Sequence, residues 1–170
     1  IRNTCRFMLG NLGNQQDPGH PRFDPATDRV PYERMLEIDR WALARTDALV
    51  RKCLKGYEDY QFHQAYNALY NFCTVDMSAF YLDILKDRLY TSATHSPERR
   101  SAQTALWAIL DAFTRLIAPI LSFTSEEVYH AMHEGRSPES RTVSVHELLF
   151  PKPEALPDAD FFLFISSFYS

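Results

Sequence analysis

This 170-residue sequence has no long apolar run, and that absence excludes one class of protein. No stretch approaches the roughly 20 apolar residues that a membrane-spanning helix needs. The start of the sequence does not resemble a signal peptide, because Arg2, Asn3 and Arg6 interrupt its apolar residues. The sequence also lacks an initiator methionine, so we expect it to be an excised piece of a longer chain.

Cysteine is scarce as well. Cys5, Cys53 and Cys73 lie far apart in the sequence, and no two of them form a CxxC pair. An odd and sparse set of cysteines indicates no disulfide framework and is typical of a reducing compartment. The sequence therefore favours a cytoplasmic location.

An excess of positive charge is also missing. The formal net charge is −4 at pH 7, with the acidity in the last third of the sequence and a nearly neutral balance before it. Such a domain does not supply a strong nonspecific field for phosphates. It binds RNA only if its basic side chains gather on one edge.

The sequence shows helical periodicity in most of its length, whereas runs with the two-residue period of a strand are nearly absent. Long helical segments with short connections predict an all-α fold, an antiparallel helical bundle. The expected helices cover residues 1–12, 32–57, 60–73, 76–90, 97–120 and 124–133.

Residue choices predict where several of these helices begin and end. Gly13 stands where a glycine commonly ends a helix. Ser96 followed by Pro97 is typical of an N-cap with a first-turn proline. Thr124 and Glu127 have the spacing of a capping box, in which each side chain satisfies a free N–H group at the helix start.

Three stretches depart from the helical pattern. Residues 14–31 hold several prolines and a glycine, and loops of that length are often functional. Residues 74–76 predict a break or kink between two helices. Residues 142–150 alternate loosely and predict a short extended strip.

The periodicity also predicts which side chains face the core. The inward residues are expected to be Met35, Ile38, Ala42, Leu49 and Cys53 in the second helix, Phe62, Tyr66, Leu69 and Cys73 in the third, and Met77, Phe80, Tyr81, Ile84 and Leu85 in the fourth. The opposite face of the second helix has the pattern of an ordinary solvated surface, with Glu37, Arg40, Asp47, Arg51 and Lys55.

Five pieces of the sequence have residues that are more specific than the formation of a helix requires. They are IRNTCRFMLGNL at 1–12, MLEIDRWAL at 35–43, DMSAFYLDILKDRLY at 76–90, LIAPILSFTSEEVY at 116–129 and SVHELLFP at 144–151. In this order and spacing they resemble the anticodon-binding helical domain of the isoleucyl-tRNA synthetases, a class I aminoacyl-tRNA synthetase family. The valyl, leucyl and methionyl siblings share the architecture but look less like the KDRLY and DRWAL segments.

The resemblance covers roughly residues 1–151, which we expect to form the anticodon-binding bundle. Residues 152–170 are left as a C-terminal tail of uncertain structure. Within it, residues 161–169 are apolar and aromatic where the family continues in a charged helix, and they are too few to span a membrane. Docking on the bundle, pairing with a second copy and a sequence boundary all stay open for this segment.

The resemblance implies a parent enzyme that joins isoleucine to its tRNA with ATP and Mg²⁺, and that carries Zn²⁺ in other modules. HIGH-type and KMSKS-type motifs are absent from this sequence, so we expect neither catalysis nor a cofactor in this piece. Its expected role is to bind the tRNA anticodon stem-loop beside the catalytic domain of the same parent chain. A non-enzymatic helical module that binds protein is the alternative, and a large exposed apolar patch would favour it.

Arg6 is the first candidate for contact with RNA. It lies with Arg2 and Asn3 to one side of the apolar stripe of the first expected helix. The planar guanidinium group of an arginine fits phosphates and base edges. The alternative is a surface arginine that pairs with a carboxylate on a neighbouring helix.

Phe23, next to Arg22 on the long loop, is the second candidate. Bases of single-stranded RNA stack on aromatic rings and guanidinium planes. The alternative is that Phe23 fixes the loop onto the bundle.

Lys86 and Arg88, near the end of the fourth expected helix, complete the candidate RNA-binding set. Cations near a helix C-terminus also complement its dipole, which is the alternative interpretation. Arg40 and Trp41 are expected to be a structural ion pair and a core ring rather than a nucleotide clamp.

His130 and His133 have a spacing that can bind zinc. No cysteine or third strong ligand accompanies them, so we expect a polar helix end and no metal site.

Overall fold

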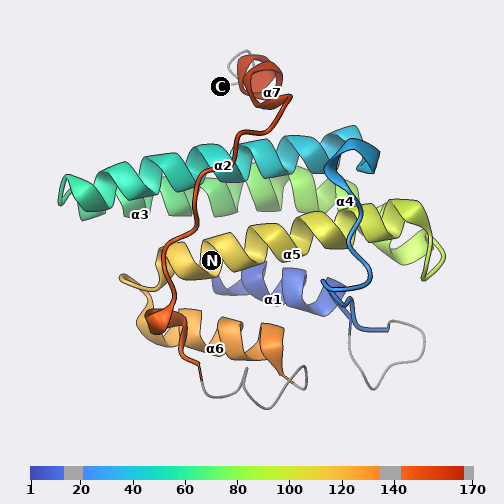
Figure 1. Ribbon diagram of the computed structural model, residues 1–170, viewed down its shortest axis with the longest axis horizontal. Helices are drawn as coiled ribbons and strands as arrows, with labels where there is room; N and C mark the ends of the chain where they lie inside the picture. The colour runs from blue at the N-terminus through green and yellow to red at the C-terminus, as the bar shows by residue number, and fades with distance from the viewer. Residues whose placement is uncertain (14–20, 135–142, 167–170) are drawn as a thin grey trace.

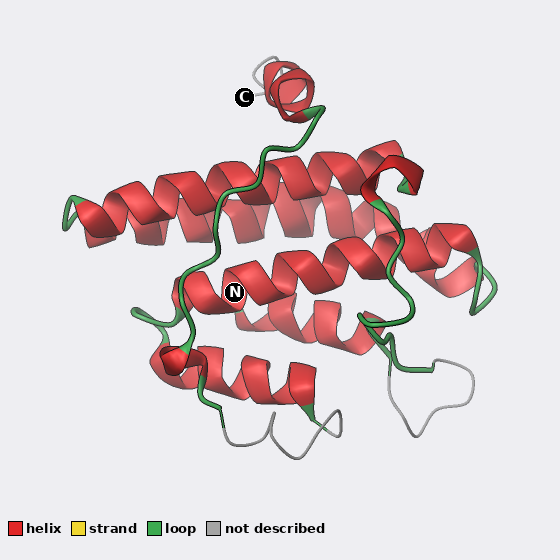
Figure 2. Ribbon diagram, in the orientation of Figure 1, coloured by secondary structure: helices red, strands yellow, loops and turns green. Residues whose placement is uncertain are grey.

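The computed structural model describes residues 1–13, 21–134 and 143–166, and this part of the chain contains helices and no strand (Figure 2). The all-α prediction is confirmed. The elements in chain order are α1 (Arg2–Asn11), a 3₁₀ turn η1 (Tyr32–Arg34), α2 (Glu37–Glu58), α3 (Phe62–Asn71), a π-helical segment η2 (Phe72–Tyr81), α4 (Leu82–Thr91), α5 (Pro97–Ile117), α6 (Ser122–His133), a second 3₁₀ turn η4 (Val145–Glu147) and α7 (Ala159–Ser166).

The helices pack around α5, with α1, α3 and α6 running opposite to it and α2 running in the same direction (Figure 1). The neighbours α2 and α3 run in opposite directions on one side of α5, and α6 runs antiparallel to α5 on the other side, with α1 beside both. The apolar face of α5 forms the centre of the core, where Leu106, Ile109 and Phe113 are completely buried. The helix begins as its sequence predicts, because the Ser96 side chain accepts a hydrogen bond from the backbone N–H of Arg99.

The inward face of α3 differs from the one that the periodicity predicts. Phe62 and Tyr66 are exposed, whereas Ala65 is completely buried. At this point α2 and α3 approach so closely that a Cβ atom built on Gly56 would lie 3.4 Å from the Cβ atom of Ala65. Only small side chains fit between the two helices, so the aromatic rings lie on the outside.

The expected break at residues 74–76 is wrong. The backbone stays helical from α3 through η2 into α4, but with the wider turns of a π-helix. No proline or glycine interrupts this stretch, and the Thr74 hydroxyl donates to the carbonyl of Tyr70. Of the expected stripe, Phe80 and Ile84 are exposed. Its buried members are Met77, Tyr81 and Leu85, and Leu82 and Leu89 are buried beside them although the periodicity did not mark them.

The start of α6 is also a correction. The helix begins at Ser122 with Leu121 as its N-cap residue and without a capping side chain, so Thr124 lies inside the first turn. The carboxylate of Glu127 instead binds Arg2 of α1. A capping box does occur at η4, where the Ser144 hydroxyl and the Glu147 carboxylate bind each other's backbone N–H groups.

The chain at and after η4 runs across the bundle and is bound to it by hydrogen bonds. Within the expected strip at 142–150, residue 142 lies outside the described residues and the rest forms η4 and irregular chain. Glu126 of α6 accepts hydrogen bonds from Ser144 and from the backbone N–H of Val145. Burial would raise the pKa of the Glu126 carboxyl group, but these bonds and His130 more than offset it and lower that pKa.

The C-terminal segment, residues 148–166, crosses α2 (Figure 1) and contacts part of the face that the sequence marked as solvated. Arg40 of α2 forms an ion pair of 2.6 Å with Asp158, which confirms the expectation of a structural ion pair. Asp47 accepts a hydrogen bond of 2.6 Å from the backbone N–H of Glu154. Helix α7 then packs against α2, with Phe162 buried and Phe161 exposed. Residues 167–169 of the apolar tail lie outside the described residues.

A single buried carboxylate joins four elements. Asp39 of α2 is completely buried, and one of its oxygens accepts from the Tyr81 hydroxyl at 2.8 Å and from Arg88 at 2.5 Å. The other oxygen accepts from Ser101 of α5 at 2.5 Å. Burial, followed by the charge of Asp39, raises the pKa of the Tyr81 hydroxyl well above its ordinary value. Asp39 therefore fixes α2, η2, α4 and α5 relative to one another.

Replacing Asp39 by alanine should lower the free energy of unfolding by about 3–5 kcal/mol, because the charge of Arg88 would stay partly buried without its partner. The matched control is Asp59→Ala, which removes the exposed ion pair with Lys55 and should change stability by less than about 1 kcal/mol. Urea unfolding followed by circular dichroism measures both. Equal, small effects of the two substitutions would contradict the central role of Asp39.

Candidate nucleic-acid interface

Arg6 of α1 and Arg22 of the long loop line the same cleft. The cleft has a volume of about 410 Å³. Its walls come from α1, from Arg22 of the loop, from Trp107 of α5 and from the end of α6. The lining residues are Arg6, Leu9, Gly10, Leu12, Gly13, Arg22, Trp107, Ala131, Met132 and Glu134.

The amphipathic pattern of α1 places Arg6 at this cleft. Cys5, Met8 and Leu12 are buried against the bundle, so Arg6 lies on the exposed side of the helix. Gly13 has a φ of 86°, a left-handed conformation that glycine adopts without strain, and it directs the chain away from the helix end as predicted. In the described parts of the chain, Arg6 has neither an ion-pair partner nor a hydrogen-bond partner for its guanidinium group.

Arg22 is held by the end of α6. Its guanidinium group donates to the carbonyl oxygens of Ala131 at 3.1 Å, Met132 at 2.7 Å and Glu134. A cation in this position satisfies free carbonyl groups and complements the helix dipole. Burial lowers the pKa of the guanidinium group, and the nearby charge of Glu134 partly opposes that effect. Arg22 thus fixes one wall of the cleft.

Phe23 does not present its ring to the solvent. The side chain is completely buried, with its ring centroid 6.4 Å from that of Trp107. The backbone N–H of Phe23 donates to the carbonyl oxygen of Leu12 at 2.7 Å, so the loop returns directly onto the end of α1. Phe23 therefore fixes the loop to the bundle, which was the alternative interpretation of the sequence. For a base to stack on Phe23, the ring would have to leave the core.

The other two candidates on α1 lie on its exposed surface. Arg2 forms a two-pronged ion pair with Glu127 of α6, with both distances 2.9 Å. Both side chains are more than half exposed, so this pair contributes little to stability and can open. The sequence offered pairing with a carboxylate on a neighbouring helix as the alternative role of Arg6. In the structure it is Arg2 that makes such a pair. Asn3 is exposed beside it.

The two candidates on α4 have different surroundings, and no contact between described residues joins either to the cleft. Arg88 is largely buried and belongs to the Asp39 network, which makes it a structural residue rather than an exposed RNA contact. Lys86 is exposed and pairs with Asp83 at 2.8 Å.

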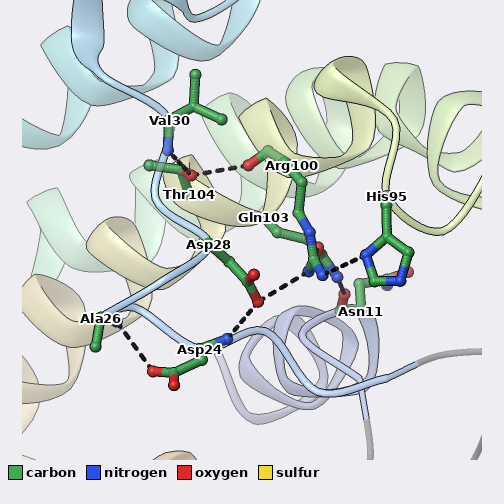
Figure 3. Close-up of polar contacts among 9 residues, drawn as sticks. All are labelled: Asn11, Asp24, Ala26, Asp28, Val30, His95, Arg100, Gln103 and Thr104. Atoms are coloured by element: carbon green, nitrogen blue, oxygen red, sulfur yellow. Dashed lines mark hydrogen bonds and ion pairs between the residues drawn. The ribbon is translucent and has the colours of Figure 1, made fainter.

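Polar side chains of α5 hold the loop that carries Arg22 (Figure 3). Arg100 pairs with Asp28 at 3.3 Å, and the Thr104 hydroxyl accepts from the backbone N–H of Val30 at 3.0 Å. The Gln103 amide donates to the carbonyl of Asn11 at the end of α1. Sequence reasoning missed these residues. The only signal for them was the polarity of Gln103 and Thr104 at positions that the long apolar helix buries.

Asp24 and Asp28 stabilise the same loop through hydrogen bonds between its own residues. The backbone N–H of Asp24 donates to the Asp28 carboxylate, and the backbone N–H of Ala26 donates to the Asp24 carboxylate, each at 2.9 Å (Figure 3). Such bonds are typical of Asp in turns. They show how a segment without regular structure keeps a defined path next to the cleft.

Comparison with known proteins identifies the family. The family described as the anticodon-binding domain of tRNA ligase matches residues 39–167. This chain belongs to that family. The matched residues run from the first turn of α2 to the end of α7, whereas α1 and Arg22, which complete the cleft, precede the matched part.

Curated relatives of this tRNA-ligase domain are similar over most of its length. It is 54% identical over 146 residues to the isoleucine–tRNA ligase of Syntrophotalea carbinolica, which is 86% of this chain. It is 52% identical over 155 residues to that of Carboxydothermus hydrogenoformans and 49% identical over 152 residues to that of Geobacter sulfurreducens. The chain spans only 14% of the first relative's length and 15% of each of the other two.

The two histidines near the end of α6 have local partners in this tRNA-ligase domain. His130 lies 3.0 Å from Glu126, and His133 contacts the carbonyl oxygen of Tyr129 at 2.9 Å. No group of three His, Cys, Asp or Glu side chains placed to hold a metal occurs among residues 1–13, 21–134 and 143–166. Within the same described residues, none of the helices is long and apolar enough to cross a membrane.

Replacing Arg22 by alanine should loosen the wall of the cleft. The loss of charge-assisted hydrogen bonds to α6 should lower the free energy of unfolding by about 1.5–3 kcal/mol. Amide hydrogen exchange should become faster at residues 21–23 and 131–134. Arg29→Ala is the matched control, because Arg29 is an exposed arginine on the same loop, and it should change stability by less than about 0.5 kcal/mol. Unchanged exchange in Arg22→Ala would show that the wall does not depend on this side chain.

Proposed function

We propose that this chain is the domain of an isoleucine–tRNA ligase that binds the anticodon arm of the tRNA. The observation that carries the proposal is the 54% identity to an isoleucine–tRNA ligase over 86% of the chain. Other curated relatives with the same name are 46–52% identical over most of the chain. This agreement favours the isoleucine enzyme over its valyl, leucyl and methionyl siblings.

The cleft between α1 and α6 is the surface that we propose for the RNA. Arg6 is exposed at the cleft and has no described partner, so its five N–H donors are available to a phosphate or a base edge. Asn3 and Arg2 extend this surface along α1, and the Arg2–Glu127 pair can open to release a second cation. Arg22 supports the cleft from the opposite wall. Lys86 of α4 is a separate, exposed candidate for contact with the phosphate backbone.

The parent chain would attach isoleucine to its tRNA with ATP and Mg²⁺ in the cytoplasm. Residues 1–170 carry no HIGH-type or KMSKS-type motif, so we assign ATP, Mg²⁺ and any Zn²⁺ to other parts of the parent. The partners of this domain are then the tRNA and the catalytic domain of the same chain. Within the piece, we propose residues 1–151 as the bundle proper and residues 152–170 as a C-terminal tail, whose described part, residues 152–166, binds α2.

A helical module that binds only protein is the competing function. Its supporting observation is a set of exposed aromatic side chains on α3. Against it stand the family of this chain and the cleft with Arg6 and Arg22. The aromatic side chains have a separate explanation, which is given below.

The Arg6→Ala substitution in the full-length parent tests the RNA surface. If Arg6 contacts a base edge, kcat/KM for tRNA should fall by the equivalent of about 1–3 kcal/mol. ATP–pyrophosphate exchange driven by isoleucine should stay unchanged, because that reaction does not use the tRNA. The melting temperature should also barely move, since an exposed arginine contributes little to stability.

The control for this experiment is Arg34→Ala, which removes an exposed arginine of η1 that does not line the cleft. It should leave kcat/KM for tRNA close to that of the unmodified enzyme. An unchanged tRNA parameter together with reduced stability in Arg6→Ala would assign Arg6 a structural role and remove it from the interface.

Salt dependence provides an independent prediction. A domain with so few available cations should bind an anticodon stem-loop weakly, and its affinity should fall steeply with salt. If Arg6 contacts a phosphate, Arg6→Ala should lower the slope of log K against log salt by about one. Fluorescence anisotropy at several salt concentrations measures this slope, and a slope that is the same in both proteins would exclude a phosphate contact.

A further inference from the structure

A row of aromatic side chains lies exposed along one side of α3 and at its start. Tyr60, Phe62, Tyr66 and Tyr70 form this row, and we refer to them as the aromatic stripe. Their exposed fractions are 82%, 50%, 42% and 49%. Phe62, Tyr66 and Tyr70 follow one another at intervals of four residues, so they share one side of the helix. The rings of Tyr66 and Tyr70 stack with centroids 6.3 Å apart, and those of Tyr60 and Phe62 meet edge to face at 6.3 Å.

The start of the stripe is anchored to the bundle. The Phe62 ring lies 6.0 Å from that of Tyr57, which in turn stacks at 5.2 Å on Phe150 of the C-terminal segment. The Tyr57 hydroxyl donates to the carbonyl oxygen of Leu116 in α5 at 2.6 Å. Leu149, beside Phe150, is 80% exposed. The Phe62 end of the stripe is therefore held against the bundle by ring contacts.

The chemistry of this surface selects one kind of partner. Residues 60–75 contain no Asp, Glu, Lys or Arg, whereas charged residues recur along the whole of α2. The exposed polar side chains between the rings are amides, with His63 as the single titratable side chain besides the tyrosines and Cys73. RNA bases can stack on aromatic rings, but the phosphates beside those bases need cations, and residues 60–75 supply no lysine or arginine. Depletion of charge with enrichment of Tyr and Phe is typical of the buried centre of a protein interface.

We propose that the aromatic stripe docks on an uncharged, apolar protein surface of the same parent chain, outside residues 1–170. This inference rests on the part of the proposed function in which the chain is one domain of a longer protein. The relative that is 54% identical is about seven times as long as the 146 matched residues, since the match spans 14% of it. Much of that polypeptide is thus available as the occupant. A charge-free face is complementary to an apolar surface, and a permanent neighbour in the same chain would keep the stripe out of water.

The stripe and the RNA cleft do not compete for space. The stripe lies on α3, on the side of α5 where α2 packs, whereas the cleft lies between α1 and α6 (Figure 1). The bundle can therefore hold a tRNA and the rest of its parent chain at the same time.

Labelling of introduced thiols in the full-length parent tests this inference. Tyr66→Cys places a thiol in the stripe, and Gln64→Cys is the matched control. Gln64 is exposed on the same helix but is only two residues from Phe62 and from Tyr66, so it does not share their side. Maleimide modification of each site is followed by mass spectrometry of its peptide. Buried Cys53 serves as an internal check that the domain stays folded.

Without tRNA, the thiol at position 66 should react at least about tenfold more slowly than the thiol at position 64, at any protein concentration. Tyr70→Cys should behave like Tyr66→Cys. Equal rates at positions 64 and 66 would overturn the inference. Protection that needs added tRNA would make the stripe an RNA surface, and protection that disappears on dilution would make it a contact between two copies, so each of these results overturns the proposed occupant.

Failure of this inference can be told apart from failure of the proposed function. The Arg6→Ala measurements depend on the tRNA alone, whereas the labelling rates are measured without it. Protection of position 66 combined with an unchanged tRNA parameter in Arg6→Ala would support docking and reject the cleft as the RNA surface.

Discussion

The structure depends on the buried carboxylate of Asp39. An unpaired charge in the core would be strongly unfavourable, so this position is tolerable only because three donors from three other elements surround it. The hydrophobic side chains of a helical bundle allow several similar packings, and shape alone distinguishes them weakly. The bonds of Asp39 to Tyr81, Arg88 and Ser101 fix the positions of α2, η2, α4 and α5 and so define one arrangement of the core.

The candidate interface follows from that arrangement through α5. Near its start, this helix binds Asp39 through Ser101, and the adjacent Arg100, Gln103 and Thr104 bind the loop and α1. The loop in turn carries Arg22 to the end of α6. The cleft is therefore built from parts that are far apart in the sequence, and its geometry depends on the packing of the core. Of the two cleft arginines, Arg6 is the one without a partner among the described residues, which makes it the side chain available for recognition.

The sequence predicted the helices well because their signals are local. Ser96 and Gly13 act within one turn of their own positions, and the apolar face of α5 is long enough to define its phase. The wrong predictions of buried faces depend on contacts between elements. Phe62 and Tyr66 have the spacing of core residues, but the close approach of Gly56 to Ala65 leaves no room for rings.

The same limit applies to the candidate site. Arg2, Arg6 and Asn3 could be placed on the exposed side of α1 from the sequence, because a helix fixes its own faces. Arg88 and Phe23 could not be assigned, because their environment is set by Asp39 and Trp107, which are distant in the sequence. The resemblance to a family could supply the class of ligand, but only the fold shows that Arg6 and Arg22 share a cleft.

The central claim is that the tRNA contacts this domain at the cleft between α1 and α6. Photochemical crosslinking of tRNA to the full-length parent, followed by mass spectrometry of the attached peptides, tests it most directly. Crosslinks from nucleotides of the anticodon arm should fall on peptides that contain residues 1–13 and on the end of α6. Crosslinks from the anticodon arm that fall on α3, or that miss residues 1–170 altogether, would contradict the account.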